Sequence, residues 1–237
     1  SGLFGCGGKN QAEALNQEKV AEIVGECQQG KYEYRKISTS GPGQEEVFAY
    51  EGKVIHDPYE EYVRIADEYA ELSSMQSESY YTENGSGYSV QVKSPDGSIT
   101  EQQDIQPPFL YGYGEELSFS YDREERVNGV RCNVYTTNYQ DTVGGEPDFP
   151  GTEPIDFTIR QEYYIDPDKK QVVRVDTDLG ERNRANEIIM SMVSAQSIGD
   201  PISQEEAEEN VENRDFSAGE ILEISNFNGN IDIQPFK

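Results

Sequence analysis

The sequence predicts an α+β fold in which a long meander of hairpins forms one curved antiparallel β-sheet, a half-barrel. An apolar stripe near the N-terminus has helical spacing, and much of the remaining chain alternates with a period of two between turn signals. A meander of this length buries its apolar side by curling around a helix laid in its concave face. We therefore expect a single domain over residues 10–237, with an N-terminal helix and a helical insertion packed on the concave side.

Two segments have the spacing of amphipathic helices. In residues 10–29, ahead of Gly30 at the position of a C-cap, four side chains recur at i, i+3, i+4 and i+7: Val20, Ile23, Val24 and Cys27. Residues 59–74 predict the helical insertion, because four side chains share one helical face: Tyr62, Ile65, Ala66 and Tyr69. Residues 186–198 fit a helix and a strand equally well, and both interpretations remain open.

The hairpins are clearest in the second half of the chain. Alternating apolar residues flank Asn128-Gly129, a strong tight-turn dipeptide: Leu117, Phe119 and Tyr121 before it, and Val130, Cys132 and Val134 after it. A second hairpin turns at 166–169. Between the two, residues 141–154 hold three Pro and three Gly and predict a flexible loop. Nearer the N-terminus, Glu51-Gly52-Lys53 reads as a turn between two short strands.

Charge excludes several classes of partner. The 237 residues contain 46 acidic and 19 basic side chains, for a net charge of −27. Nucleic acid is excluded because its binding depends on Lys and Arg that neutralise phosphates, and a basic face for anionic lipid is absent for the same reason. No apolar run approaches the roughly 20 residues that cross a bilayer. We expect a monomer with a solvated acidic surface.

The N-terminal segment predicts a lipid anchor. Leu3-Phe4-Gly5-Cys6 resembles a bacterial lipobox, although Phe4 stands where a small residue is usual. A Cys thiolate is suited to form a thioether with a diacylglycerol, and two buried acyl chains give stable anchoring. We therefore expect a signal-peptide remnant, lipidation at Cys6 and a tether up to residue 9. This places the protein on the extracytoplasmic face of the cell membrane, and the alternative is that Cys6 is an incidental thiol.

Two cysteines remain once Cys6 is set aside. Cys27 and Cys132 form an even pair, which is compatible with a disulfide in an exported protein. The alternative is that both are buried side chains that behave as small hydrophobes. Neither interpretation implies a metal or redox site, because neither Cys belongs to a CxxC motif or neighbours a His.

Motifs of known catalytic chemistry are missing from the sequence. His56 is the single histidine, and it precedes Asp57-Pro58, where we expect an exposed turn. GxSxG, HExxH, Walker A and dinucleotide-binding glycine patterns do not occur. We therefore expect a protein that is not an enzyme, with no catalytic residue, no cofactor and no metal.

Three segments resemble one family of lipoproteins. Residues 127–135, and 163–166 followed by 172–175, resemble hairpins common in LolA-like proteins, and residues 224–235 resemble the closing segment of that group. Gram-positive lipoproteins related to the mycobacterial LppX/LprG group share this arrangement behind an N-terminal Cys. The resemblance implies a curved sheet whose apolar concave side carries lipid acyl chains or lipoproteins.

This resemblance leads to an expected function. The chain is expected to bind or carry an apolar ligand, a lipid or a lipoprotein acyl chain, in the half-barrel. The candidate lining residues are the apolar side chains expected to face inward: Leu117, Phe119, Val134, Phe157, Ile159 and Tyr163. The alternative for each is an ordinary core position. The alternative function is a cell-surface module that binds protein or glycan through exposed Tyr-rich loops around 141–154, without a ligand cavity.

Overall fold

A computed structural model describes residues 15–72, 77–85, 87–105 and 117–237. Cys6 and the predicted tether lie outside these residues. The described chain forms three α-helices, a short 3₁₀ helix over Asp67–Leu72, and one curved antiparallel sheet, which confirms the predicted fold class. The helices are α1 (Gln17–Gln29), α2 (Gly180–Ser197) and α3 (Gln204–Val211). The strands are β1 (Lys31–Ser40), β2 (Glu45–His56), β3 (Tyr59–Ile65), β4 (Glu78–Glu83), β5 (Tyr88–Lys93), β6 (Ile99–Ile105), β7 (Ser120–Val127), β8 (Val130–Val143), β9 (Ile155–Asp166), β10 (Gln171–Asp178) and β11 (Ala218–Ser225).

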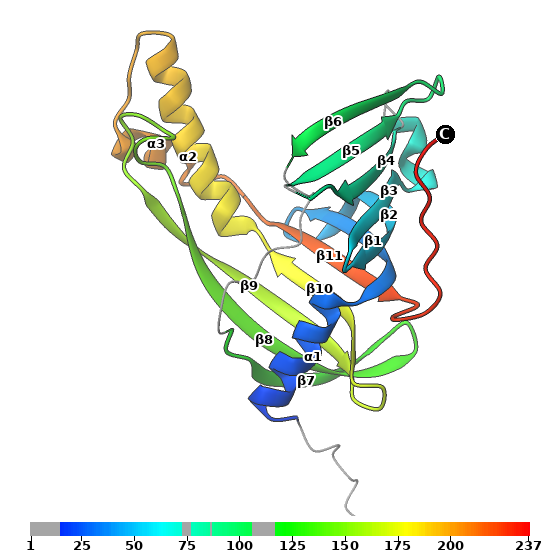
Figure 1. Ribbon diagram of the computed structural model, residues 1–237. Coiled ribbons are helices and arrows are strands. Elements are labelled where there is room, and N and C mark those ends of the chain that lie inside the picture. The colour runs from blue at the N-terminus through cyan, green and yellow to red at the C-terminus, as the bar shows by residue number, and fades with distance from the viewer. Residues whose placement is uncertain (1–14, 73–76, 86, 106–116) are drawn as a thin grey trace, which may run out of the picture.

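The sheet has the order β6-β5-β4-β3-β2-β1-β11-β10-β9-β8-β7 (Figure 1). It consists of two meanders, β1–β6 and β7–β11. They are joined where β1 pairs antiparallel with β11, in a register that sets Glu33 opposite Ser225 and Ser40 opposite Ala218. Strands from the two ends of the described chain therefore meet in the middle of the sheet.

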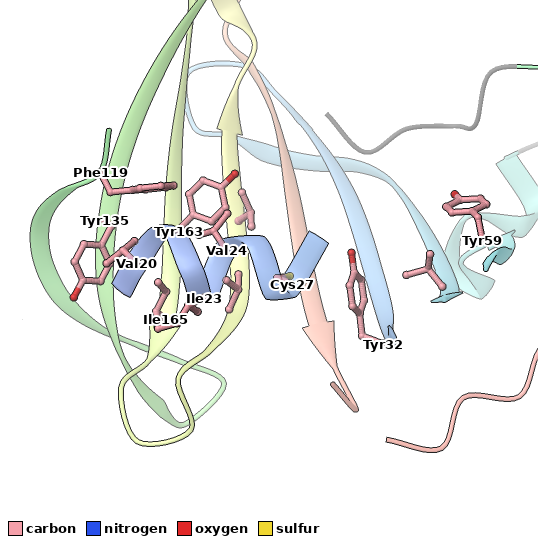
Figure 2. Packing of buried hydrophobic residues seen from close by; sticks show 13 residues of the cluster. Val20, Ile23, Val24, Cys27, Tyr32, Tyr59, Phe119, Tyr135, Tyr163 and Ile165 are labelled. Atoms are coloured by element: carbon pink, nitrogen blue, oxygen red, sulfur yellow. The ribbon is translucent and has the colours of Figure 1, made fainter. Parts of the chain in front are cut away.

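Helix α1 covers one face of the sheet, which we call the inner face. Its predicted stripe, Val20, Ile23, Val24 and Cys27, is buried against side chains from β8, β9 and β10 (Figure 2). Asn16 caps the start of the helix: its Oδ1 accepts a hydrogen bond from the N–H of Lys19 at 2.9 Å. The predicted N-terminal helix is confirmed. Within the described residues it covers Gln17–Gln29.

Helices α2 and α3 cover the far end of the inner face. Ala185 of α2 packs with Phe157 and Ile159 of β9. Ile188 and Met192, one helical turn apart, pack against Ala207 and Val211 of α3. Of the two interpretations left open for 186–198, the helix is correct, because the apolar side chains at helical spacing pack against another helix. None of the described helices is both long enough and apolar enough to span a membrane.

The predicted helix over residues 59–74 is wrong. Tyr59–Ile65 forms β3, which pairs with both β2 and β4. Its side chains alternate between the faces, with Tyr59 and Glu61 directed inward and Tyr62 outward. Tyr, Val and Ile favour pleated sheet, and two neighbouring strands satisfy the backbone of β3 on both sides. Only Asp67–Leu72 keeps a helical form, as one short 3₁₀ segment.

The C-terminal residues lie on the opposite, outer face. Ile231 and Ile233 pack with Tyr80 of β4, and the N–H of Phe236 donates a hydrogen bond to Gln91 Oε1 at 3.1 Å. Figure 1 shows this red segment beside the first meander. The segment stays extended without pairing as a strand. It packs on part of the outer face of β2–β5.

The segment 141–154 is held by local hydrogen bonds. The N–H of Gly145 donates to Thr152 Oγ1 at 2.9 Å, and the N–H of Phe149 donates to Gly145 O at 2.9 Å. The only tyrosines among the exposed large hydrophobic side chains of the described residues, Tyr50 and Tyr121, belong to β2 and β7 rather than to this segment.

Candidate functional site

The inner face of the first meander contains a cavity of about 950 Å³. It is formed by β1–β5, by residues 94–96 of the following turn, and by one residue of β11. Figure 2 shows Tyr32 and Tyr59 beyond the end of α1, where the helix no longer lies over the sheet. Most of the cavity lining is apolar or aromatic: Tyr32, Tyr34, Phe48, Tyr50, Val54, Tyr59, Val63, Ile65, Tyr81, Val92 and Leu222.

Strand alternation directs these side chains to the same side. Successive residues of a strand point to opposite faces, so Tyr32, Tyr34 and Lys36 of β1 all face inward. In β3 the alternating inward residues are Tyr59, Glu61, Val63 and Ile65. Because α1 ends at Gln29 and packs chiefly on β10, it leaves this part of the inner face uncovered.

Gly52 gives the ring of Tyr34 its place in the cavity wall. It lies directly opposite Tyr34 in the β1–β2 pair. A Cβ on Gly52 would lie only 2.7 Å from Tyr34 Cε1. The glycine therefore lets the ring lie across β2 and reach β3. The predicted turn at Glu51-Gly52-Lys53 is wrong, because β2 runs continuously through these residues: a glycine within a strand here marks close approach of a ring.

A buried carboxyl group forms the polar part of the cavity wall. Glu61 is 8% exposed, and its two carboxylate oxygens accept hydrogen bonds from the phenols of Tyr34 and Tyr59, one on each oxygen. Burial raises the pKa of Glu61 above its ordinary value, against the opposing effects of the two phenols and of Lys36. Burial, reinforced by the neighbouring Glu61, also raises the pKa of both tyrosines, so both phenols stay protonated as donors.

The two basic residues at the cavity are paired with acids. Lys36 Nζ lies 3.4 Å from Glu220 Oε2, on the neighbouring strand β11. Arg64 contacts Glu51 at 2.9 Å and Asp67 at 2.7 Å. Their positive charges are thus balanced by carboxylates. Within the described part of the chain, no group of three or more His, Cys, Asp or Glu side chains is arranged to hold a metal ion.

The six predicted lining residues lie elsewhere, and none of them lines this cavity. Phe119 and Tyr163 pack edge to face under α1, with ring centroids 5.5 Å apart and Leu117 beside them. Phe157 and Ile159 lie under α2. Val134 points to the outer face, where it packs with Cys132 and Tyr164. The structure therefore divides these residues among three clusters, in which each packs against protein side chains.

The predicted disulfide between Cys27 and Cys132 is not formed. Both thiols are free and buried. Cys27 lies on α1 over the inner face, whereas Cys132 belongs to the cluster on the outer face, so the sheet separates the two side chains. Burial raises the pKa of Cys27 to about 12 and that of Cys132 to about 11. Both behave as small buried hydrophobes, the alternative that the sequence left open.

His56 is not the exposed turn residue that its position predicts. It ends β2, immediately before the turn at Asp57-Pro58, and is half-buried. Its ring lies 5.5 Å from that of Tyr32 and 6.1 Å from that of Tyr59, centroid to centroid. Burial lowers its pKa to about 4, so the imidazole is neutral at physiological pH.

Sequence reasoning missed the cavity because it sought the lining in residues 117–163, whereas all of the lining except Leu222 comes from the first hundred residues. The alternation of Tyr32 and Tyr34 with charged residues signalled one inward face. The prediction of a helix over 59–74 hid the inward-facing residues of β3, which form another part of the cavity wall. If that segment is instead read with a period of two, Glu61 falls on the inward side between Tyr59 and Val63, which is the signal that could have located it.

Comparison with known proteins gives structural neighbours but no assigned family. No family model matches the sequence, and no curated protein matches it. The solved structure of the Mycobacterium tuberculosis lipoprotein LppX is 12% identical, with a TM-score of 0.47, over 93% of this chain and all of that one. A DUF1329 family protein from Desulfovibrio piger is 13% identical, with a TM-score of 0.31, over 92% of this chain and 93% of that one.

A third structural neighbour is a putative outer membrane lipoprotein-sorting protein domain from Vibrio parahaemolyticus. It is 11% identical, with a TM-score of 0.27, over 90% of this chain and 92% of that one. Proteins like LppX and LolA are thus among the structural neighbours, as the resemblance predicted.

Proposed function

We propose that this protein is a lipid-anchored extracytoplasmic lipoprotein that binds or carries an apolar ligand, a lipid or acyl chain, in the inner-face cavity. The observation that carries the proposal is the cavity itself, which measures about 950 Å³ beside an otherwise well-packed core. This volume lies within the range of small-molecule sites, which are mostly apolar with a few placed polar groups.

The state of the lining side chains supports a ligand rather than a core. Tyr34, Tyr81 and Leu222 face inward yet are only half-buried, whereas Tyr163 and Ile165 under α1 are almost fully buried. Apolar side chains beside a void lack partner atoms and lose dispersion energy. An alkyl chain would supply those contacts, and each methylene that it buries would contribute about 0.8 kcal/mol of hydrophobic free energy to binding.

The proposal is tested by filling the cavity. Val63→Trp places a large ring among the inward side chains of β3, where the wild-type side chain is half-buried and lines the cavity. We expect the variant to fold and to lose uptake of a fluorescent fatty-acyl probe, measured as probe fluorescence at increasing protein concentration. Thermal unfolding of each variant reports whether the substitution disturbs the fold.

Val173→Trp is the matched control. Val173 is also a half-buried strand valine, but it packs on the outer face with Val134 and Tyr164. It should leave probe uptake unchanged even if it reduces stability. A wild-type protein that takes up no probe would refute the proposed function, and so would a folded Val63→Trp variant with undiminished uptake.

A further inference from the structure

The buried carboxyl of Glu61 has acceptor capacity that its protein partners leave unused. An ionised carboxylate accepts about four hydrogen bonds. Tyr34 donates to Oε1 and Tyr59 to Oε2, and their hydroxyl hydrogens are used in doing so. The phenol oxygens then offer lone pairs only. This end of the cavity therefore presents hydrogen-bond acceptors, which suit a donor on a ligand and disfavour a carboxylate or phosphate.

The charges around Glu61 favour a cation. Lys36 is balanced by Glu220, and Arg64 by Glu51 and Asp67. The carboxylates of the cavity and its immediate pairs thus outnumber the cations. The wall adds several aromatic rings, whose faces attract positive charge within about 6 Å of the ring centre: Tyr32, Tyr34, Tyr59 and Tyr81.

From this arrangement we propose that Glu61, held by Tyr34 and Tyr59, is a head-group site that binds a primary ammonium carried on an alkyl chain. The inference rests on the proposed function, because it names which chain-bearing molecule the cavity selects. The ammonium donates hydrogen bonds to the free lone pairs of the Glu61 carboxylate, and the chain lies along Val63, Val92 and Leu222. Hydrogen bonds between ionised groups are roughly twice as strong as neutral ones.

Binding of the ammonium should depend on pH through Glu61. Burial raises the pKa of this carboxyl above its ordinary value of 4.5, so affinity should fall as the pH drops through that raised pKa, while the ammonium itself stays charged. The titratable and charged side chains around Glu61 come from β1, β2, β3, β4, β11 and the turn at 94–96: Tyr32, Tyr34, Lys36, Tyr50, His56, Tyr59, Arg64, Tyr81, Asp96 and Glu220. The pKa of Tyr34, Tyr59 and Tyr81 is raised, so these phenols stay neutral over the same pH range.

The test uses three probes that share one chain: dodecylamine, dodecanoate and methyl dodecanoate, each below its micelle concentration. Their affinities are measured by displacement of the fluorescent fatty-acyl probe. Wild type should bind the amine most tightly. Glu61→Gln should weaken the amine about tenfold or more, the effect of losing one hydrogen bond to a charged group, and should leave the ester nearly unchanged.

Glu78→Gln is the matched control variant. Glu78 of β4 also accepts a hydrogen bond from a tyrosine, Tyr62, but this pair is formed on the outer face and does not line the cavity. It should leave all three affinities unchanged. If Glu61→Gln does not fold, the wild-type pH profile decides: acid should weaken the amine and not the ester.

The outcomes separate this inference from the proposed function. If wild type takes up no fluorescent probe, the proposed function fails and this inference fails with it. If the probe is taken up but dodecylamine does not displace it, the inference about the head group alone is refuted. If all three bind equally, or if Glu61→Gln weakens them alike, the chain site stands and head-group selection by Glu61 is refuted. An amine affinity that is constant through the acid range also refutes it.

Discussion

The cluster of Tyr34, Tyr59 and Glu61 in the cavity wall can form because the neighbouring Gly52 has no side chain. The inward alternation of Tyr32 and Tyr34 can be read from the sequence. The sequence does not show that the ring of Tyr34 crosses β2 to reach Glu61. This contact depends on the register that sets Gly52 opposite Tyr34. Residue types predict the face of a strand, whereas contacts across strands follow from pairing between segments distant in the chain.

His56 makes the free energy of unfolding depend on pH. Burial lowers its pKa from 6.5 to about 4 in the folded protein, so the unfolded chain binds a proton more tightly. The contribution of His56 to the free energy of unfolding is therefore fully present above pH 6.5, and it is lost as the pH falls from there towards 4. We expect a loss on the order of 2 kcal/mol, allowing for partial exposure.

Urea unfolding of wild type and His56→Gln across this pH range measures the effect of His56. The variant should lose less stability than wild type as the pH falls. Parallel curves for the two proteins would show that His56 is not responsible.

Among the elements, local pattern and sheet pairing compete in ways that differ between α1 and β3. The stripe of α1 is amphipathic and its helix is capped by residues beside it, so a reading of the sequence finds it. Residues 59–65 satisfy both periods, since Tyr62 and Ile65 fit a helical face while Tyr59, Glu61 and Val63 alternate. The strand forms because β2 and β4 lie on both sides of it, a circumstance invisible to local reading.

The position of α1 also determines the state of the cysteines. Because Cys27 lies on the inner face and Cys132 on the outer face, we expect no bridge, and we expect both thiols to be protected in the folded protein. Thiol titration of a Cys6→Ala variant should detect neither Cys27 nor Cys132 before unfolding and both in denaturant without reductant. The melting temperature should be the same with and without reductant. Loss of both thiols in the unreduced, denatured protein would contradict this expectation.

At the scale of the whole molecule, an open sheet has two edges to protect from pairing with other chains. The edge strand β7 is rich in charge, with Asp122, Arg123, Glu124 and Glu125 in succession. Charged edge strands discourage pairing between copies. The net charge of −27 adds repulsion between molecules. Both features favour the monomer that the sequence predicts, which stays a prediction.

The predicted attachment to a membrane rests on Cys6, which lies outside the described residues. With its signal peptide, the wild-type protein should fractionate with membranes because two acyl chains on one Cys give stable anchoring. Cys6→Ala should release it into the soluble fraction. Wild-type protein recovered free of membranes with an unmodified Cys6 thiol would end the anchoring hypothesis.

The pairing of β1 with β11 has a consequence for how the protein is made. A chain emerging from the ribosome at about 5–20 residues per second can assemble hairpins as they appear. The strand β1, however, waits for almost the whole chain before its second neighbour exists. All of the cavity lining except Leu222 belongs to the first hundred residues. Most of the cavity lining is therefore synthesised while one edge of β1 is still unpaired, and β11, the last of the described strands, completes both the pairing and the lining.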